Sequence, residues 1–390
     1  MKALLPLLRI STFTTLNEVV ILMKKISTAL FAVFLCMLFI GCEQNTDEAA
    51  QTAKFDLSSF ATDKGIYYLD QSAYLKFFDY SSGRNVFLCT KPECTHDTED
   101  CYASNNARFI LVENDRLYTI DGESNLVSRN LDGSDSSVIM KLCSEYNNSS
   151  DSVATPMSAI STGGRFYLTY DVEVLDSDKG KEEKKTVLTC VDPGSKTEEI
   201  ILEDNNAQYS IINAIDDCLY FFEYKTNSND GSLADINNVS CVLSMMKLTD
   251  KSVSVVYQDK QIDFNPCGYL DETIYFSKDN DPVNNLYSLT FQNPEPVKQE
   301  YRSLYNDNDG NIVYDYSDNK YKIEKDGKLS ELTLGKNTDI AFDYEANNGL
   351  VFSCISGNLE GKNGEINEQD DFYVSKEDFY ADKNQYYKIG

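Results

Sequence analysis

Residues 65–69 read Gly-Ile-Tyr-Tyr-Leu, and a phrase of the same kind recurs six more times along the chain. Each copy joins a turn to a hydrophobic pair and further strand-forming side chains. The other copies are Arg116–Ile120, Arg165–Leu168, Cys218–Phe222, Thr273–Phe276, Asn311–Tyr314 and Gly349–Phe352. Gly, Asn or Asp stands just ahead of nearly every copy, where a hairpin turn would deliver the chain into the strand. The repeat therefore predicts seven similar β units.

The spacing of the units indicates how they are arranged. Successive hydrophobic pairs lie 51, 49, 53, 55, 38 and 38 residues apart, close to the roughly 40–50 residues of a four-stranded propeller blade. No segment shows the period of an amphipathic helix. We expect an all-β fold, a seven-bladed β-propeller over residues 56–390, in which ring closure removes exposed sheet edges. Two β-sandwiches or a six-bladed ring are the alternatives, and Phe55-Asp56-Leu57 is available as a closing strand.

The composition favours β structure and argues against a nucleic-acid partner. The 390 residues include 26 Tyr and 20 Phe but no Trp, and aromatic side chains suit pleated, half-buried surfaces. Acidic residues number 63 against 35 basic ones, which gives a formal net charge of −28. Such a surface repels phosphate backbones. We therefore expect no nucleic-acid binding.

Residues 24–42 have the plan of a secretory signal. A Lys-Lys pair is followed by a mostly apolar run, Ile26–Ile40, and then by Gly41 and Cys42. The run has 15 residues, whereas a membrane-spanning helix needs about 20. We therefore expect residues 1–41 to be a cleaved signal peptide. Met23 directly precedes the basic pair, as an initiator would, so the true start is expected there.

The segment Leu38-Phe39-Ile40-Gly41-Cys42 is similar to a bacterial lipobox, although Phe39 stands where Leu is usual. Cleavage between Gly41 and Cys42 would leave a lipid-bearing cysteine at the new N-terminus. A diacylated cysteine holds a protein stably at a membrane. Residues 42–55 are polar and small, which is typical of a flexible tether. We expect a protein lipid-anchored through Cys42 to the extracytoplasmic face of the membrane.

One segment carries a sharp chemical pattern. Cys89, Cys94, His96 and Cys101 lie within 13 residues and include the chain's only histidine. Three thiolates and one imidazole are a ligand set of closed structural zinc sites. In an extended strand Cys94 and His96 would point to opposite sides, so a turn is required, and Pro92 and Asp97 are suited to forming it.

Three interpretations of this segment stay open. A disulfide between two of the cysteines fits an exported domain. A structural zinc or iron ion held by all four side chains is the second, and a reduced structural loop is the third. Full pairing within one chain is impossible, because nine cysteines remain in residues 43–390 once Cys42 carries lipid. The scattered ones resemble small buried core residues. In each case we expect the segment to fix a crossover between blades.

The chain resembles a group of exported lipoproteins of low-GC Gram-positive (Firmicutes-type) bacteria, whose exported part is similar to a seven-bladed propeller. The resemblance runs from Met23 to the C-terminus and is carried by the lipobox, the repeated phrase and the Cys89–Cys101 segment. It implies a lipid-anchored propeller outside the cell and supplies no established activity.

Motifs of common enzyme classes are missing from the sequence. There is no G-x-S-x-G elbow, no H-E-x-x-H helix and no phosphate-binding loop. Asp307-Asn308-Asp309-Gly310 is similar to a calcium loop, but Tyr316 stands where the bidentate Glu is needed. We expect a non-enzymatic module that binds a protein, peptide or glycan of the envelope or surroundings. The alternatives are a carbohydrate-active hydrolase or lyase using carboxylates at the central mouth, and metal capture at Cys89–Cys101.

Overall fold

The computed structural model describes the larger of two compact units, Ala50–Gly390. Within it the described residues are 59–70, 72–96, 101–103, 109–176, 181–226, 239–258, 265–270, 272–278, 285–306, 310–315, 320–325, 328–332, 339–346, 349–381 and 383–389. Gly41, Cys42 and the tether predicted at 42–55 lie outside these ranges. Among the described residues, no helix has the length and apolar character needed to cross a membrane.

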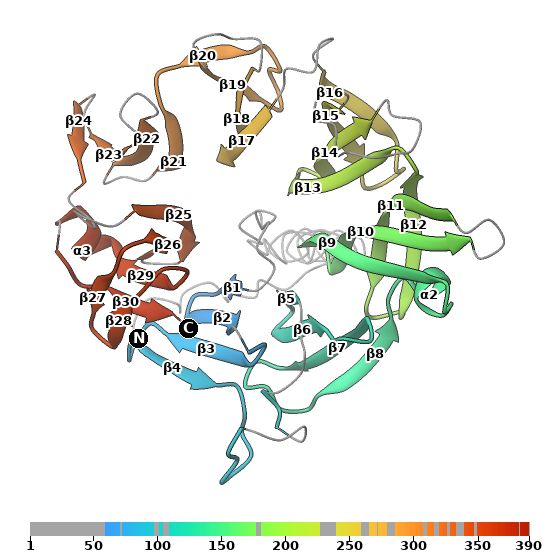
Figure 1. Ribbon diagram of the computed structural model, residues 1–390, viewed down its shortest axis with the longest axis horizontal. Coiled ribbons are helices and arrows are strands. Elements are labelled where there is room, and N and C mark those ends of the chain that lie inside the picture. Colours follow the sequence, from blue (N-terminus) through green and yellow to red (C-terminus); the bar gives the residue numbers. More distant parts are fainter. Residues whose placement is uncertain are drawn as a thin grey trace, which may run out of the picture. The chain divides into compact units, whose positions relative to one another are not determined.

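Seven antiparallel four-stranded sheets form a ring, a seven-bladed β-propeller (Figure 1). The first three sheets are β1 (Ser59–Ala61), β2 (Gly65–Leu69), β3 (Leu75–Asp79) and β4 (Arg84–Phe87); β5 (Phe109–Glu113), β6 (Arg116–Ile120), β7 (Asn125–Asn130) and β8 (Ser137–Lys141); and β9 (Ser152–Thr162), β10 (Arg165–Asp176), β11 (Lys181–Asp192) and β12 (Thr197–Asp204). The fourth sheet is β13 (Ala207–Ile215), β14 (Cys218–Thr226), β15 (Val239–Lys247) and β16 (Val253–Gln258).

The remaining sheets follow in chain order. They are β17 (Asn265–Leu270), β18 (Thr273–Ser277), β19 (Leu286–Thr290) and β20 (Val297–Gln299); β21 (Arg302–Asn306), β22 (Asn311–Asp315), β23 (Lys320–Lys325) and β24 (Lys328–Glu331); and β25 (Asp339–Ala346), β26 (Gly349–Ser356), β29 (Asp371–Ser375) and β30 (Tyr387–Ile389). A separate hairpin pairs β27 (Leu359–Gly361) with β28 (Gly364–Ile366). Two short helices, α2 (Ser144–Asn147) and α3 (Lys376–Tyr380), complete the described elements.

The seven predicted copies of the phrase are the second strands of the seven sheets: β2, β6, β10, β14, β18, β22 and β26. The seven-bladed prediction is confirmed, and the alternatives of a six-bladed ring or two sandwiches are wrong. In three sheets the residues ahead of the phrase form tight hairpin turns with two consecutive positive φ angles, at Asn114–Asp115, Gly163–Gly164 and Asp216–Asp217. Such turns match the twist of paired strands.

The core lies between neighbouring sheets. Separate clusters of buried apolar side chains join adjacent blades, for example Phe222 and Leu243 of the fourth sheet with Phe276 and Leu289 of the fifth. Each blade buries both faces against its neighbours, which explains why the second strands read as continuous hydrophobic runs.

The seventh blade meets the first without exchanging a strand among the described residues. All four strands of the last sheet come from 339–389, and Phe55–Leu57, the proposed closing strand, lies outside the described residues. Aromatic contacts hold the seam instead: Tyr80 stacks on Tyr373 with ring centroids 4.9 Å apart, and Phe78 lies 5.6 Å from Tyr373. The Asn85 side-chain amide also donates to the Lys388 carbonyl at 3.1 Å.

Candidate metal centre

The cysteine–histidine segment belongs to the crossover from β4, the last strand of the first blade, to β5, the first strand of the second. Leu88 packs with Leu75, Ile110 and Leu117 in a cluster that joins the two blades. The backbone of Leu75 holds both ends of the segment, because its carbonyl accepts from Leu88 N–H at 3.0 Å and its N–H donates to the Ala103 carbonyl at 2.9 Å. The crossover is therefore fastened to the first blade on either side of the cysteines.

Local turns bring the predicted ligands to one side. Pro92 and Glu93 form a turn closed by a 3.4 Å hydrogen bond from Cys94 N–H to the Lys91 carbonyl, and Glu93 has φ +60°. Pro followed by a left-handed residue is the signature of a type II turn. His96 also has φ +61°. The predicted turn is thus present at Pro92, while Asp97 lies outside the described residues.

The four predicted residues converge. The Sγ atoms of Cys89, Cys94 and Cys101 and a ring nitrogen of His96 all lie within 4.8 Å of one another. His96 Nδ1 is 3.3 Å from Cys101 Sγ. Tetrahedral zinc, with Zn–S about 2.3 Å and Zn–N about 2.0 Å, requires its donors to be roughly 3.5–3.8 Å apart. The cluster therefore needs only a small rearrangement of its side chains to hold such an ion.

The electrostatics of the cluster favour a thiolate at Cys89. Burial raises the pKa of its thiol, but backbone hydrogen bonds from Lys91 and Tyr102 and side-chain hydrogen bonds with Cys94 and Cys101 outweigh this and leave the pKa below its ordinary value. The thiolate is the form of cysteine that binds metals. The loop thus makes Cys89 easier to deprotonate than an ordinary cysteine.

An aromatic side chain packs against the histidine of the cluster. The ring of Phe87 stacks on His96 with centroids 4.3 Å apart and an interplanar angle of 16°. The ammonium of Lys76 lies 4.7 Å from the Phe87 centroid. Cys101 is buried, whereas the other three candidate ligands are half-buried. The stack fixes the orientation of the imidazole and limits the access of water to it.

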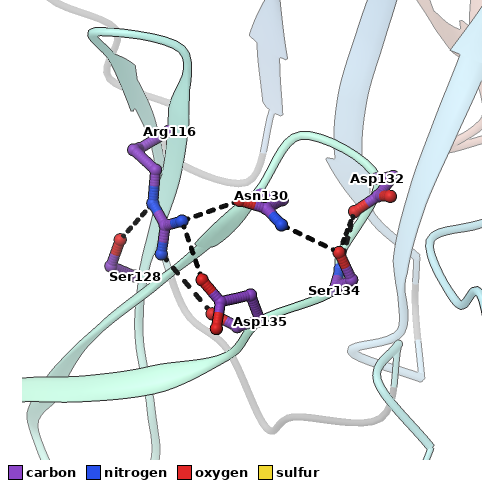
Figure 2. Close-up of polar contacts among 6 residues, drawn as sticks. All are labelled: Arg116, Ser128, Asn130, Asp132, Ser134 and Asp135. Atoms are coloured by element: carbon purple, nitrogen blue, oxygen red, sulfur yellow. Dashed lines mark hydrogen bonds and ion pairs between the residues drawn. The ribbon is translucent and has the colours of Figure 1, made fainter.

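The second blade packs closely against the start of the crossover. The hairpin between β7 and β8 turns at Asp132, Gly133 and Ser134. The Asp132 carboxylate accepts hydrogen bonds from the backbone N–H and the hydroxyl of Ser134, and the Asn130 amide donates to that hydroxyl (Figure 2). Gly133 has φ +82°, and a Cβ placed on it would lie 2.3 Å from the Leu88 carbonyl oxygen. A glycine is needed here for two reasons: the left-handed backbone and the close approach of the crossover.

The cysteines outside this segment behave as core residues. Free thiols are found at Cys143, Cys190, Cys241 and Cys354, which are buried, and at Cys218, which is half-buried. Burial raises the pKa of the Cys143 thiol to about 12, which makes it unreactive at neutral pH. Among the described residues, only Cys89, Cys94, His96 and Cys101 form a group of three or more potential ligands able to hold an ion.

Comparison with known proteins identifies the fold of this chain but assigns the chain to no family. No family model and no curated protein matches the sequence. A crystal structure of a puromycin hydrolase mutant matches with TM-score 0.55 and 9% identity over 87% of this chain and 54% of that chain. Oligogalacturonate lyase from Vibrio parahaemolyticus matches with TM-score 0.46 and 10% identity, over 79% and 88% of the two chains. Acylaminoacyl peptidase from Pyrococcus horikoshii matches with TM-score 0.41 and 12% identity, over 86% and 47%.

At these identities the matches show a shared propeller fold and nothing about activity. The chain spans about half the length of the matched hydrolase and peptidase chains. By its fold, therefore, the protein is a seven-bladed β-propeller.

Proposed function

We propose that this protein is a zinc-clamped β-propeller that serves as a non-enzymatic binding module outside the cell. The observation that carries the zinc clamp is the convergence of three thiols and one imidazole within 4.8 Å on a crossover. Four protein ligands leave no open coordination position, and a closed set is typical of structural rather than catalytic zinc. The role of the ion is then to fix the crossover between the first two blades.

Metal analysis of the purified protein tests the clamp. We expect about one zinc per chain, and removal by a strong chelator should lower the melting temperature, because metal binding adds to folding free energy. Iron in place of zinc would change the identity of the ion but not the role of the site. Less than about 0.1 equivalent of any metal, in protein prepared without chelator, would refute the clamp.

Matched substitutions separate this site from the other thiols. Cys94→Ser should abolish stoichiometric zinc, whereas Cys218→Ser, at a half-buried thiol outside the cluster, should leave it unchanged. Titration of accessible thiols in unfolded, unreduced protein distinguishes zinc from the competing disulfide. A disulfide between two of Cys89, Cys94 and Cys101 would remove two thiols from that count.

We propose in addition that Cys42 carries a lipid anchor. The support comes from the sequence alone: the basic pair, the apolar run and the Gly41-Cys42 junction. Cells that express the protein and are fed a radiolabelled or clickable fatty acid should incorporate it, and Cys42→Ala should abolish labelling. Unlabelled wild-type protein in the membrane fraction would refute lipidation.

The binding role is supported by the loops that a ring of seven blades presents on each side. The proposed partner is a protein, peptide or glycan of the envelope or surroundings. The purified residues 43–390 should bind cell-wall or extracellular-matrix fractions saturably. Release of new reducing ends from a glycan panel would instead indicate a hydrolase or lyase, and absence of any saturable retention would refute the binding role.

A further inference from the structure

Arg129 is an unusual residue for the interior of a propeller blade. Its side chain, on β7 of the second sheet, is 1% exposed and is the largest fully buried side chain of the described residues. No carboxylate of the described residues pairs with it, and its Nε has no hydrogen-bond partner. Burial lowers the pKa of the guanidinium to about 10, so it remains charged at neutral pH. A buried charge without a counterion is strongly unfavourable.

The one hydrogen bond that the Arg129 side chain makes within the described part of the chain leads to the cysteine segment. Its Nη1 donates to the carbonyl oxygen of Tyr102 at 2.7 Å. Tyr102 directly follows Cys101, and its own backbone forms a hydrogen bond to the Cys89 thiolate. Across the strand pair, Arg129 faces Leu117, which packs against Leu88 at the start of the crossover. The guanidinium therefore contacts the backbone of the residue that directly follows Cys101, one of the four candidate ligands.

The charge of the occupied centre explains this arrangement. Three thiolates, one neutral imidazole and one divalent cation have a net charge of minus one. We propose that Arg129 is the buried counter-charge of this centre, a positioning residue that acts on the ligands through Tyr102. This inference rests on the zinc clamp. It goes further in assigning all three cysteines to the thiolate state and the ion to the divalent class.

Arg116 provides the contrast within the same sheet. Its guanidinium donates to Ser128 at 2.9 Å and Asn130 at 2.7 Å, and it forms a 3.2 Å ion pair with Asp135, as Figure 2 shows. Arg116 thus has its counterion within its own sheet, in the turn between β7 and β8, whereas no carboxylate of the described residues pairs with Arg129. Arg116→Met is therefore a matched control for loss of an arginine from this blade.

Zinc affinity measured by competition with a chromophoric chelator tests the inference. Outer-shell partners typically change metal affinity 10–100-fold, so we expect Arg129→Met to weaken zinc binding by about tenfold or more. Arg129→Lys, which retains the charge, should remain within about threefold of wild type, and so should Arg116→Met. Because zinc competes with protons for thiolates, the loss in Arg129→Met should grow as pH falls.

The outcomes keep the two proposals apart. Wild-type protein without zinc refutes the clamp and this inference with it. Wild-type protein with one zinc, and Arg129→Met with unchanged affinity, refutes the counter-charge alone. If Arg129→Met does not fold, the zinc affinity of Arg129→Lys decides between the outcomes. A tenfold loss despite the retained charge would show that shape, not charge, is what the site requires.

Discussion

Gly133 sets how closely the second blade approaches the crossover. Alanine at this position would bring a Cβ against the Leu88 carbonyl in addition to straining a left-handed backbone. The strain alone costs about 1–2 kcal/mol, and the clash adds to it because a backbone atom cannot move without displacing the crossover. We expect Gly133→Ala to lower the free energy of unfolding by more than about 2 kcal/mol and also to weaken zinc binding.

Gly163→Ala is the control for Gly133→Ala. Gly163 also has a positive φ, +59°, but a Cβ on it would meet nothing within 4 Å. The Gly163→Ala variant should therefore lose only the free energy of unfolding that the strained backbone costs. It should show no further loss from a clash and no change in zinc affinity. Equal losses of stability in the two variants, measured by denaturant unfolding, would contradict the proposed contact.

Glu198 makes a pH-dependent contribution to stability. Burial raises the pKa of its carboxyl group, while a backbone hydrogen bond from Cys143 partly opposes the rise. A raised folded-state pKa gives a stabilising contribution that is complete below the unfolded pKa and is lost as pH rises through the folded one. The unfolding free energy of wild type minus that of Glu198→Gln should therefore decrease as pH rises above about 4, the ordinary pKa of a glutamate. A difference that is flat or rises over this range would contradict the assignment.

Spacing along the chain predicted that the four candidate ligands converge, but it did not predict the arginine that contacts the backbone beside them. Cys89, Cys94, His96 and Cys101 lie close together in sequence, so a single turn suffices to gather them. Arg129 reaches the same site from another blade. Its place depends on how two sheets pack, and in the sequence it reads as one more residue of a strand. The chain contained no local signal that would have identified it.

At the scale of elements, the hairpin turns are where local sequence and backbone agree most closely. Asn114 and Asp115 have φ of +49° and +57°, the pattern for which Asn-Gly is preferred. Replacing Asp115 by Gly should raise the free energy of unfolding by about 0.5–1 kcal/mol, because an L residue in this conformation is strained. Asp115→Val, β-branched at the same φ, should destabilise the fold instead. Thermal unfolding of both variants checks this, and a lower melting temperature for Asp115→Gly would contradict it.

Elements set by tertiary packing were not predictable in the same way. The hydrophobic pairs predicted where the second strand of each sheet lies. They did not predict strand length, because strands of 12 residues such as β10 and β11 extend well beyond the repeated phrase. The hairpin of β27 and β28 and the helices α2 and α3 are insertions of three to five residues per element. Elements this short have too few residues to show a period.

At the scale of the whole molecule, the repeat predicted a closed ring because unpaired sheet edges are unfavourable. The number of blades followed from the number of phrases. The way in which the ring closes could not be predicted, because the seam between the seventh and first blades depends on side chains from opposite ends of the chain. Tyr344, for example, donates a hydrogen bond to Ser59 across that seam at 3.1 Å. Pairs so distant in sequence carry no local pattern.

Among the described residues, the seam is held by side chains and no strand is shared between the first and seventh blades. We therefore expect the ring to open first at this seam. Tyr373 is 6% exposed and contacts both Phe78 and Tyr80 of the first blade. Truncating a large buried aromatic costs about 3–5 kcal/mol, so Tyr373→Ala should lower the free energy of unfolding by about 3 kcal/mol. Hydrogen exchange should also accelerate in β1 and β30 more than in the fourth blade.

Tyr209→Ala is the matched control for the seam. Tyr209 is 5% exposed and lies in the cluster that joins the third and fourth blades, away from the seam. Tyr209→Ala should lower the free energy of unfolding by a comparable amount while leaving hydrogen exchange in β1 and β30 close to that of wild type. If Tyr373→Ala accelerates exchange uniformly in all seven blades, the ring unfolds as one unit and the seam is no weaker than any other junction. Selective acceleration at β1 and β30 instead follows from a ring whose last junction is closed, among the described residues, by side-chain packing and side-chain hydrogen bonds.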